Sequence, residues 1–233
     1  MAPLSSAANC LVRNEWVCPE YFRTRSSQLT DALVEHIWIT VVSVLLGLLL
    51  AFPLALLARR YRKLEGLVVG TTTAIYTIPS LALFALLLPA TGLSQTTVII
   101  GLALYSLTIL VRNIIEGLKS VPEEVRESAL GMGYGRTRLL FGVELPLALP
   151  TIMAGLRVAT VSTVALTTVG SIVGYGGLGN LLIQAVDSQF RAQVLAAGLL
   201  CVLLAIAFDL VIVAVQRVLT PWSRSDTRTA AVS

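Results

Sequence analysis

The sequence has 233 residues, of which 56% are hydrophobic and 13% carry a charge, and its mean hydropathy is +0.84. In soluble domains about a quarter of the residues are charged, so this composition excludes an ordinary soluble protein. It predicts an all-α integral membrane protein. The net charge of +4 does not indicate nucleic-acid binding, since the basic residues stand in short runs beside apolar blocks. One histidine and three cysteines are too few for an ordinary metal centre, so we expect no metal and no cofactor.

The N-terminal tail, residues 1–35, is mixed and polar and is predicted to be extracytoplasmic. Its first residues lack the basic and apolar regions of a cleavable signal peptide. Cys10 and Cys18 would form a disulfide if the tail faces an oxidising compartment, and two unpaired thiols fit the sequence equally well. His36, which follows the tail, is expected at the membrane interface.

Five apolar runs follow, each close to the roughly 20 residues that cross ~30 Å of hydrocarbon. They cover residues 37–58, 67–88, 97–115, 147–173 and 194–215. We therefore predict a transmembrane domain over residues 36–219, followed by a short C-terminal tail over residues 220–233.

Lysine and arginine are concentrated on one side of these predicted spans. Arg59, Arg60, Arg62 and Lys63 follow the first span, and more basic residues stand in the loop 117–146 and in the C-terminal tail. By the positive-inside rule, we predict a multi-pass protein of the cell (cytoplasmic or inner) membrane. Its N-terminus is expected outside, and its loop and C-terminus in the cytoplasm.

The loop contains a predicted short helix. Ser120 to Glu123 has the pattern of a capping box, which marks the start of a helix. The apolar residues on one face of this helix are Val125, Ala129 and Met132. The glycines that should end it and turn the chain are Gly131, Gly133 and Gly135. A short helix that ends in a glycine turn indicates a rigid docking element for a cytoplasmic partner.

Six loop residues carry a family signature: Glu127, Ser128, Ala129, Gly133, Leu145 and Pro146. Their spacing resembles the EAA motif of the permease subunits of bacterial ABC importers. Serine stands at the second position, where alanine is usual in that family. Because serine is nearly as small, we expect a close contact at this position to be kept. The resemblance implies that these six residues couple the chain to an ATPase subunit.

The resemblance extends over about residues 30–220 and leaves residues 1–30 uncovered. The other segments that carry it are Tyr76–Leu83, Leu104–Leu107, Arg112-Asn113, Gly131–Gly133, Val143–Ala148, Ala154–Arg157 and Gly176–Gly179. They look like the permeases of osmoprotectant importers, which carry glycine betaine, choline, carnitine or proline betaine. The resemblance implies a type I ABC importer (MetI-like) transmembrane domain. It also implies three partners: ABC ATPase subunits, a second permease that is a copy or a sister chain, and an extracytoplasmic substrate-binding protein.

The sequence has no G-x-x-x-x-G-K-[ST] motif with which to bind ATP. We therefore predict that the chain is not an enzyme and that a separate subunit hydrolyses ATP. Gly174 to Gly179 fits G-x-G-x-x-G, but a dinucleotide site needs a strand before that motif. Because a membrane-length helix is predicted there instead, we expect a turn at the outer membrane face.

Pro79 stands near the middle of the predicted second span, where it removes a helix hydrogen bond and displaces the carbonyl of Ile75. Thr77, Ser80 or a neighbouring helix could satisfy that carbonyl. One interpretation is a kinked helix in which Tyr76, Pro79 and Ser80 line the translocation path. An ordinary membrane proline fits equally well.

Three charged residues, Arg112, Arg157 and Asp209, lie within or at the edge of predicted spans. An uncompensated charge there costs at least about 2.5–3.5 kcal/mol, so each should face protein or water. We predict that Asp209 pairs with Arg157 or Arg112 and steadies an inner gate, with a proton relay as the alternative. The small residues of the fourth span fit either packing within the fold or a dimer interface, and they include Gly155 and Gly170.

The sequence thus predicts the transmembrane subunit of an ATP-driven osmoprotectant importer. An ABC permease for another amine or an amino acid fits the same features. A secondary transporter driven by an ion gradient is the alternative from a different class.

Overall fold

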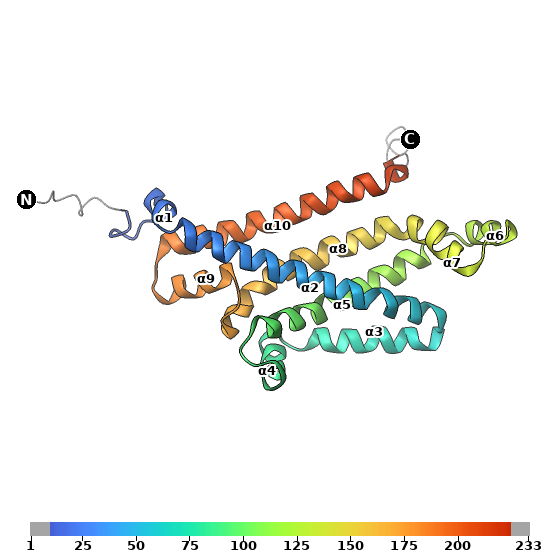
Figure 1. Cartoon of the computed structure of the whole chain (residues 1–233), viewed down its shortest axis with the longest axis horizontal. Coiled ribbons are helices and arrows are strands. Elements are labelled where there is room, and N and C mark those ends of the chain that lie inside the picture. The colour runs from blue at the N-terminus through green and yellow to red at the C-terminus, as the bar shows by residue number, and fades with distance from the viewer. Residues whose placement is uncertain (1–9, 225–233) are drawn as a thin grey trace, which may run out of the picture. The chain divides into compact units, whose positions relative to one another are not determined.

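The computed structural model describes residues 10–224, and every regular element within that range is helical (Figure 1). The predicted all-α fold is therefore confirmed. The beginning of the predicted N-terminal tail, including the region examined for a signal peptide, and most of the C-terminal tail lie outside the described residues. The helices are α1 (Pro19–Thr24), α2 (Ser26–Arg60), α3 (Arg62–Thr77), α4 (Ser80–Thr91), α5 (Gln95–Lys119), α6 (Glu123–Gly131), α7 (Arg136–Leu139), a π-helix (Leu140–Glu144), α8 (Leu145–Thr167), a 3₁₀ helix (Thr168–Val173), α9 (Leu178–Asp187), α10 (Arg191–Leu219) and a final 3₁₀ turn (Pro221–Arg224).

Four helical segments are long and apolar enough to cross a membrane: Ser26–Arg60, Gln95–Lys119, Arg136–Val173 and Arg191–Leu219. A fifth candidate is the bent pair formed by α3 and α4, if the two helices together make one span. The segment predicted as a single kinked span is therefore two helices. Pro79 lies at the break between them, because proline has no N–H to donate and restricts the backbone of Ile78 before it.

The chain divides into two compact units, and several long helices contribute to both. Unit 1 contains the chain up to Leu45 together with Ile78–Ala103 and Val161–Ala207. Its apolar core gathers residues from α2, α4, α5 and the 3₁₀ helix: Ile39, Phe84, Val98, Leu102 and Val173. This unit also buries His36 completely, with the ring Nε2 3.0 Å from the carbonyl oxygen of Val164. The interfacial position expected for His36 did not anticipate this packing inside the fold.

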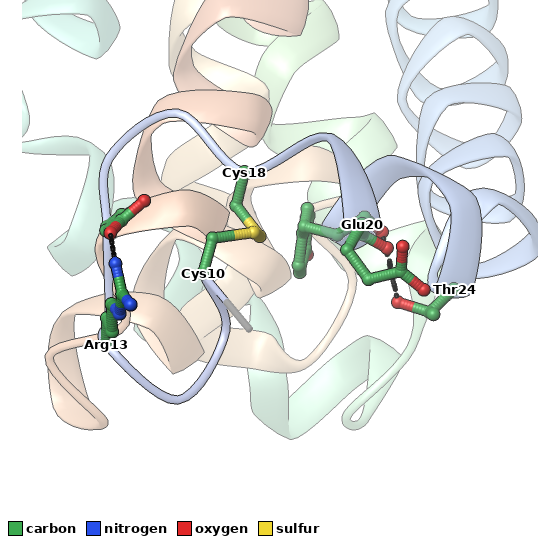
Figure 2. The surroundings of a disulfide bond; sticks show 7 residues. Cys10, Arg13, Cys18, Glu20 and Thr24 are labelled. Carbon is green, nitrogen blue, oxygen red and sulfur yellow. Dashed lines mark hydrogen bonds and ion pairs between the residues drawn. A yellow bond between two sulfur atoms is a disulfide. The ribbon is translucent and has the colours of Figure 1, made fainter. Parts of the chain in front are cut away.

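A disulfide between Cys10 and Cys18 closes the loop that precedes α1, with the two Cα atoms 5.5 Å apart (Figure 2). Of the two states that the sequence allows, the structure therefore contains the bonded one. Asn14 ties this loop to the turn between α9 and α10. Its amide nitrogen donates to the carbonyl oxygen of Gln189 (2.8 Å), and its amide oxygen accepts from the backbone N–H of Arg191 (2.9 Å).

The glycine turn before α9 also belongs to unit 1. Gly174 and Gly177 have φ angles of +87° and +54°, which favour glycine. The Asn180 side chain closes the turn, since its oxygen accepts from the Gly176 N–H and its nitrogen donates to the Gly174 carbonyl, both at 3.1 Å. A 3₁₀ helix rather than a strand precedes the turn, so the G-x-G-x-x-G motif here shapes a turn and does not begin a dinucleotide fold.

Unit 2 contains Leu46–Thr77, Leu104–Thr160 and the chain from Phe208 onward. Its core is larger, and the α2 alanines that contribute to it are Ala51, Ala55 and Ala58. Small residues let α5 and α8 approach closely. A Cβ atom placed on Gly155 would overlap the side chain of Asn113, and one on Gly117 would lie 3.0 Å from the Ala148 carbonyl oxygen. Gly155 therefore serves packing within the fold.

Candidate functional site

Helix α6 is the centre of the candidate site, and it starts differently from the sequence prediction. Pro122 is the residue before its first turn, and no side chain caps the helix. Ser120 instead donates its hydroxyl to the carbonyl oxygen of Gly117, at the end of α5, over 2.8 Å. The predicted capping box is therefore wrong, because Ser120 satisfies the previous helix. Glu123 and Glu124 do lie in the first turn of α6, where the helix dipole favours negative charge.

The end of α6 depends on Gly133. The backbone N–H of Tyr134 donates to the Ala129 carbonyl (3.1 Å), and that of Gly133 donates to the Leu130 carbonyl (2.9 Å). This pair of bonds is a Schellman motif, which requires a left-handed residue just after the helix. Gly133 supplies it with a φ of +85°, and open space surrounds the position where a Cβ atom would stand. Backbone conformation, rather than crowding, therefore explains the glycine.

The surface of α6 is mixed. Glu127 and Ser128 are exposed, and the Ser128 hydroxyl turns back to the Glu124 carbonyl at 2.7 Å, whereas Ala129 is buried. The predicted apolar face is therefore divided, because Met132 is 71% exposed. The exposed apolar side chains of this region are Val125, Leu130, Met132 and Phe141. Such side chains gathered around one short helix are typical of a protein contact surface.

The chain returns from α6 through α7 and the π-helix directly into α8. Leu145 and Pro146 lie in the first turn of α8 and are both half-buried. Because the π-helix runs directly into α8 and the Leu145 N–H donates to the Leu140 carbonyl, Pro146 stands inside a continuous helical segment and removes one hydrogen-bond donor from it. The six signature residues thus occupy two places in one folded segment, the last part of α6 with its turn and the start of α8.

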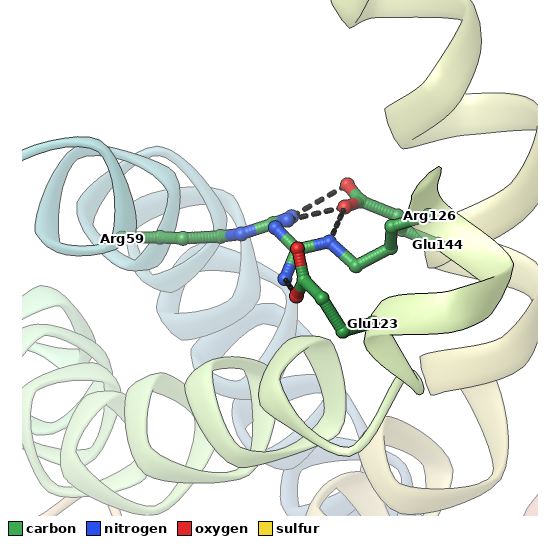
Figure 3. A network of polar contacts seen from close by, with 4 residues as sticks. All are labelled: Arg59, Glu123, Arg126 and Glu144. Atoms are coloured by element: carbon green, nitrogen blue, oxygen red, sulfur yellow. Dashed lines mark hydrogen bonds and ion pairs between the residues drawn. The ribbon is translucent and has the colours of Figure 1, made fainter. Parts of the chain in front are cut away.

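A network of charges joins this segment to the end of α2 (Figure 3). Glu144, whose side chain is 3% exposed, accepts hydrogen bonds from two arginines. Arg59 of α2 binds both carboxylate oxygens, with Nη1 2.6 Å from Oε2, and Arg126 of α6 donates from Nε over 2.9 Å. Arg126 also contacts Glu123 with its Nη1 at 2.9 Å. The buried carboxylate thereby connects α2, α6 and the π-helix.

Sequence reasoning missed this network. Glu144 lies in the segment Val143–Ala148, which was considered only for its family resemblance. The arginine runs were interpreted only as signals of membrane topology. Arg59 and Glu144 are 85 residues apart in the sequence, so no helical spacing could have indicated the pair. A carboxylate within an otherwise apolar run, at residues 139–149, was the one available signal.

The charges within the spans do not form a single cluster. The guanidinium of Arg157 binds the Asp209 carboxylate through two hydrogen bonds, Nε–Oδ1 at 2.7 Å and Nη2–Oδ2 at 2.9 Å. Of the two pairings that the sequence allows, the structure contains this one. Arg112 instead donates from Nη2 to the hydroxyl of Thr73 over 2.8 Å.

Around the α3–α4 break, Tyr76 is the predicted path residue whose surroundings are best defined. It lies in the last turn of α3, is 43% exposed, and stacks edge-to-face on Tyr105 of α5 with 5.5 Å between the ring centroids. Thr77 was one of three partners that the sequence allowed for the Ile75 carbonyl, but its hydroxyl donates to the Ala74 carbonyl instead (2.7 Å). Ser80 is the first residue of α4. Among residues 10–224, no group of three or more metal-ligating side chains is found.

Comparisons of the chain with known proteins identify its family. Residues 43–225 match the family described as "Binding-protein-dependent transport system inner membrane component". A Bacillus subtilis (strain 168) protein, the glycine betaine/carnitine/choline transport system permease protein OpuCD, is 37% identical over 202 residues, which cover 86% of this chain and 88% of the relative. The osmoprotectant import permease protein OsmW of Salmonella typhimurium is 34% identical over 206 residues, covering 86% and 96% of the two chains.

Solved structures of ABC transporters share the fold. A chain of the MetNI methionine ABC transporter in an inward-facing conformation superposes with a TM-score of 0.76 at 22% identity, covering 84% of this chain and 98% of the other. An amino acid ABC transporter solved with histidines gives a TM-score of 0.72 at 18% identity and covers 86% and 98%. The expected type I, MetI-like architecture is confirmed at the level of fold.

Proposed function

Because the chain belongs to the binding-protein-dependent transport system inner membrane component family, we propose that it is the permease subunit of an ATP-driven importer for quaternary ammonium osmoprotectants. The substrate class follows from relatives that cover most of the chain, one named for glycine betaine, carnitine and choline and one for osmoprotectants. Proline betaine is added on the family resemblance alone. One observation carries the coupling part of the proposal: α6 is a short, exposed helix with a Schellman end at Gly133, at the position of the EAA signature.

The coupling contact consists of the exposed part of α6 and its turn. Glu127, Ser128 and Gly133 face outward and meet a groove on an ABC ATPase subunit, while Ala129 anchors the helix to the rest of unit 2. Leu145 and Pro146 hold the return of the chain. Because Glu144 binds arginines of both α2 and α6, a displacement of α6 is passed to the membrane helices rather than absorbed by a slack loop.

The orientation follows from the same assignment. The loop and C-terminus lie in the cytoplasm and the N-terminus lies outside, which the Cys10–Cys18 disulfide supports because disulfides persist in oxidising compartments. A substrate-binding protein delivers cargo on the outer side, and a second permease, identical or related, completes the translocation path near Tyr76, Pro79 and Ser80.

The Arg157–Asp209 pair steadies an inner gate. Both hydrogen bonds of the pair join α8 to α10, so the two helices must separate or move together when the gate opens. A charge exchange tests this role: Arg157→Asp with Asp209→Arg should regain a large share of the uptake that each single change loses. If the double variant is no better than the single ones, the pair has no gating role.

The coupling proposal is tested with two glycine variants of the same loop. Gly133→Asp should abolish ATP-driven uptake while the protein still inserts in the membrane, because an aspartate at this left-handed position deforms the turn. Gly135→Asp is the matched control. It adds the same charge two residues away, at the N-cap of α7, where aspartate is favourable. Equal loss of uptake in both variants would contradict a role for the turn.

The driving force is tested in proteoliposomes that contain the permease, its ATPase and the binding protein. Uptake should require ATP in the compartment that contains the ATPase. An imposed ion gradient alone should not drive it. Uptake driven by the gradient with an inactive ATPase would instead identify a secondary transporter. Copurification of the chain with the ATPase, weakened by Gly133→Asp, completes the test.

A further inference from the structure

Helices α3 and α5 are joined within unit 2 by polar contacts that the coupling mechanism does not use. Arg112 donates from Nη2 to the Thr73 hydroxyl over 2.8 Å. One turn earlier along α5, the Thr108 hydroxyl donates to the backbone carbonyl of Thr72 over 2.6 Å. Both contacts lie on the face of α5 that is turned to α3, since residues three and four apart share a helix face.

The third contact in this row is aromatic. Tyr105, one further turn along the same face of α5, meets Tyr76 of α3 edge-to-face at 5.5 Å and 72°. The Tyr105 ring is buried, and the Tyr76 ring is 43% exposed. The row therefore begins at an arginine and ends at a tyrosine pair. Because an α-helix rises about 1.5 Å per residue, Thr73, which holds the arginine, and Tyr76 are about 4.5 Å apart along α3.

An open groove of about 620 Å³ runs along this face, and its lining residues are Glu65, Gly66, Val69, Gly70, Thr73, Ala74, Thr77 and Arg112. Tyr76 stands next to these lining residues in α3 and is not one of them. Gly66 and Gly70 leave the groove open, since nothing lies within 4 Å of a Cβ atom placed on either. A permanently charged guanidinium on a membrane helix faces protein or water rather than lipid. The groove is therefore a wet or protein-lined surface within the membrane.

The backbone after the end of α3 also indicates a wet or protein-lined surface. α3 ends at Thr77, one residue after Tyr76, and Ile78 and Pro79 are not helical. At membrane depth, non-helical backbone is tolerated where it is buried in protein or lines a water-filled cavity. Many secondary transporters form their substrate sites from such interrupted helices, and the same backbone chemistry is available here.

We propose that this groove is a substrate site for zwitterions that carry both a trimethylammonium group and a carboxylate, in preference to the cation choline; the proposal rests on the proposed function. The Arg112 guanidinium, which offers a fork of N–H donors, binds the carboxylate. The exposed Tyr76 ring stands beside the groove, between the lining residues Ala74 and Thr77, and binds the methylated ammonium group by cation–π attraction. The separation of one helical turn suits a short zwitterion.

Charge also explains the discrimination against choline. Choline has no carboxylate to neutralise the guanidinium beside it, so Arg112 repels the cation. Glu65, the acidic residue that lines the groove, is paired with Lys119 through an Nζ–Oε1 contact of 2.5 Å, and it therefore does not replace the missing carboxylate.

Equilibrium binding of radiolabelled glycine betaine and choline to the purified permease–ATPase complex, without the binding protein, tests the site. Saturable glycine betaine binding is expected, weakened at least about tenfold by Arg112→Gln, because a charge-assisted bond pair is lost. Choline binding should be weaker and not reduced by Arg112→Gln. Tyr76→Leu should weaken binding of both ligands, and Tyr76→Phe should preserve it because the ring remains. Arg60→Gln, a change of an exposed arginine at the end of α2, is the matched control.

Uptake in the complete system, with the binding protein, separates the two levels of the proposal. Uptake without saturable binding to the complex, or equal weakening of both ligands by Arg112→Gln in a complex that still copurifies with its ATPase, would overturn the zwitterion site and leave the proposed function standing. Stronger choline than glycine betaine binding would also overturn it. If the intact wild-type system takes up no osmoprotectant, the proposed function itself fails.

Discussion

The segment around α6 and the glycine turn before α9 are both short folded segments between long helices, but different interactions stabilise them. Around α6, long charged side chains converge on the carboxylate of Glu144. At the glycine turn, a neutral amide side chain binds backbone groups, and glycines allow backbone segments to touch. Arg59 and Arg126 keep 22% and 29% of their side chains exposed, whereas Gly179 has no room for even a methyl group.

This difference indicates different mechanical roles. Ion pairs between long side chains survive small displacements, because the side chains can rotate and keep the charges together. Contacts of backbone on backbone permit one arrangement, since close-packed interiors do not deform continuously. The α6 segment is therefore suited to receive and pass on a movement, and the glycine turn is suited to keep its shape.

Removing the central carboxylate should give the largest effect. Glu144→Gln removes the carboxylate that the two arginines share, so that Arg126 keeps only Glu123 and Arg59 loses its ion-pair partner. We expect a loss of about 2–4 kcal/mol, below the usual range for buried pairs because both arginines are partly exposed. Thermal unfolding of the purified complex measures it. Glu116→Gln, which removes an exposed partner of Lys119, should cost less than about 1 kcal/mol. Similar losses for the two variants would refute the central position of Glu144.

The glycine turn should resist substitution by a different mechanism. Gly179→Ala places a methyl group against the backbone of Thr168, and overpacking of this kind costs about 1–3 kcal/mol. Gly198→Ala in α10 is the control, because the nearest atom to its added Cβ would be 4.0 Å away. The control should be neutral or stabilising, since alanine favours helices. If Gly179→Ala is harmless, the turn adapts and the contrast with the α6 segment disappears.

A smaller effect is expected at the end of α6. Gly133→Ala forces an L-residue into a left-handed conformation and should cost about 1–2 kcal/mol. Gly131→Ala, inside the helix with open space around it, should be neutral or slightly stabilising. Hydrogen exchange of the Tyr134 amide, which donates to Ala129, reports the loss locally. Unchanged protection in Gly133→Ala would show that another contact holds the turn.

The smallest effect concerns pH and the start of unit 1. Burial raises the pKa of Tyr21, which packs edge-to-face on Phe190 at 5.4 Å, and the nearby Arg25 opposes this only in part. Because the folded state holds the proton more tightly, this stabilisation is complete below the unfolded pKa of about 10 and is lost as pH rises through the folded value. Protease sensitivity before α2 should increase above pH 10, and less so in Tyr21→Phe. A pH response that is identical in the variant would assign the effect to another group.

Much of the fold follows from the sequence, because the apolar runs are long enough to dictate helices. The α3–α4 break was the main exception. From the sequence, Pro79 fitted a kinked helix and an ordinary membrane proline equally well, and both interpretations kept one continuous span. The non-helical conformation of Ile78 before the proline interrupts the helix, and only the structure contains that information.

The candidate site was predictable only where its residues are close in sequence. Gly133 was identified because a helix signal and a glycine turn are local. The Glu144 network was missed, because its partner arginine lies on another helix. Asp209 was partly predictable. Its position within a predicted span required a partner of opposite charge, and both Arg157 and Arg112 were compatible with the topology. The choice of Arg157 follows from which helix faces are in contact.

The π-helix at Leu140–Glu144 gives the segment before α8 a defined rotational setting. A π turn accommodates one more residue than an α turn, and such insertions are often found at functional sites. Deleting one residue between Leu140 and Val143 should restore a regular α-helix and rotate everything before it by about 100° about the axis of α8. Glu144 would then point away from Arg126, and α6 would present a different side to its partner. The extra residue of the π turn thus sets the angle at which the proposed coupling surface is presented, and its deletion should abolish uptake without changing any residue that we propose to contact an ATPase.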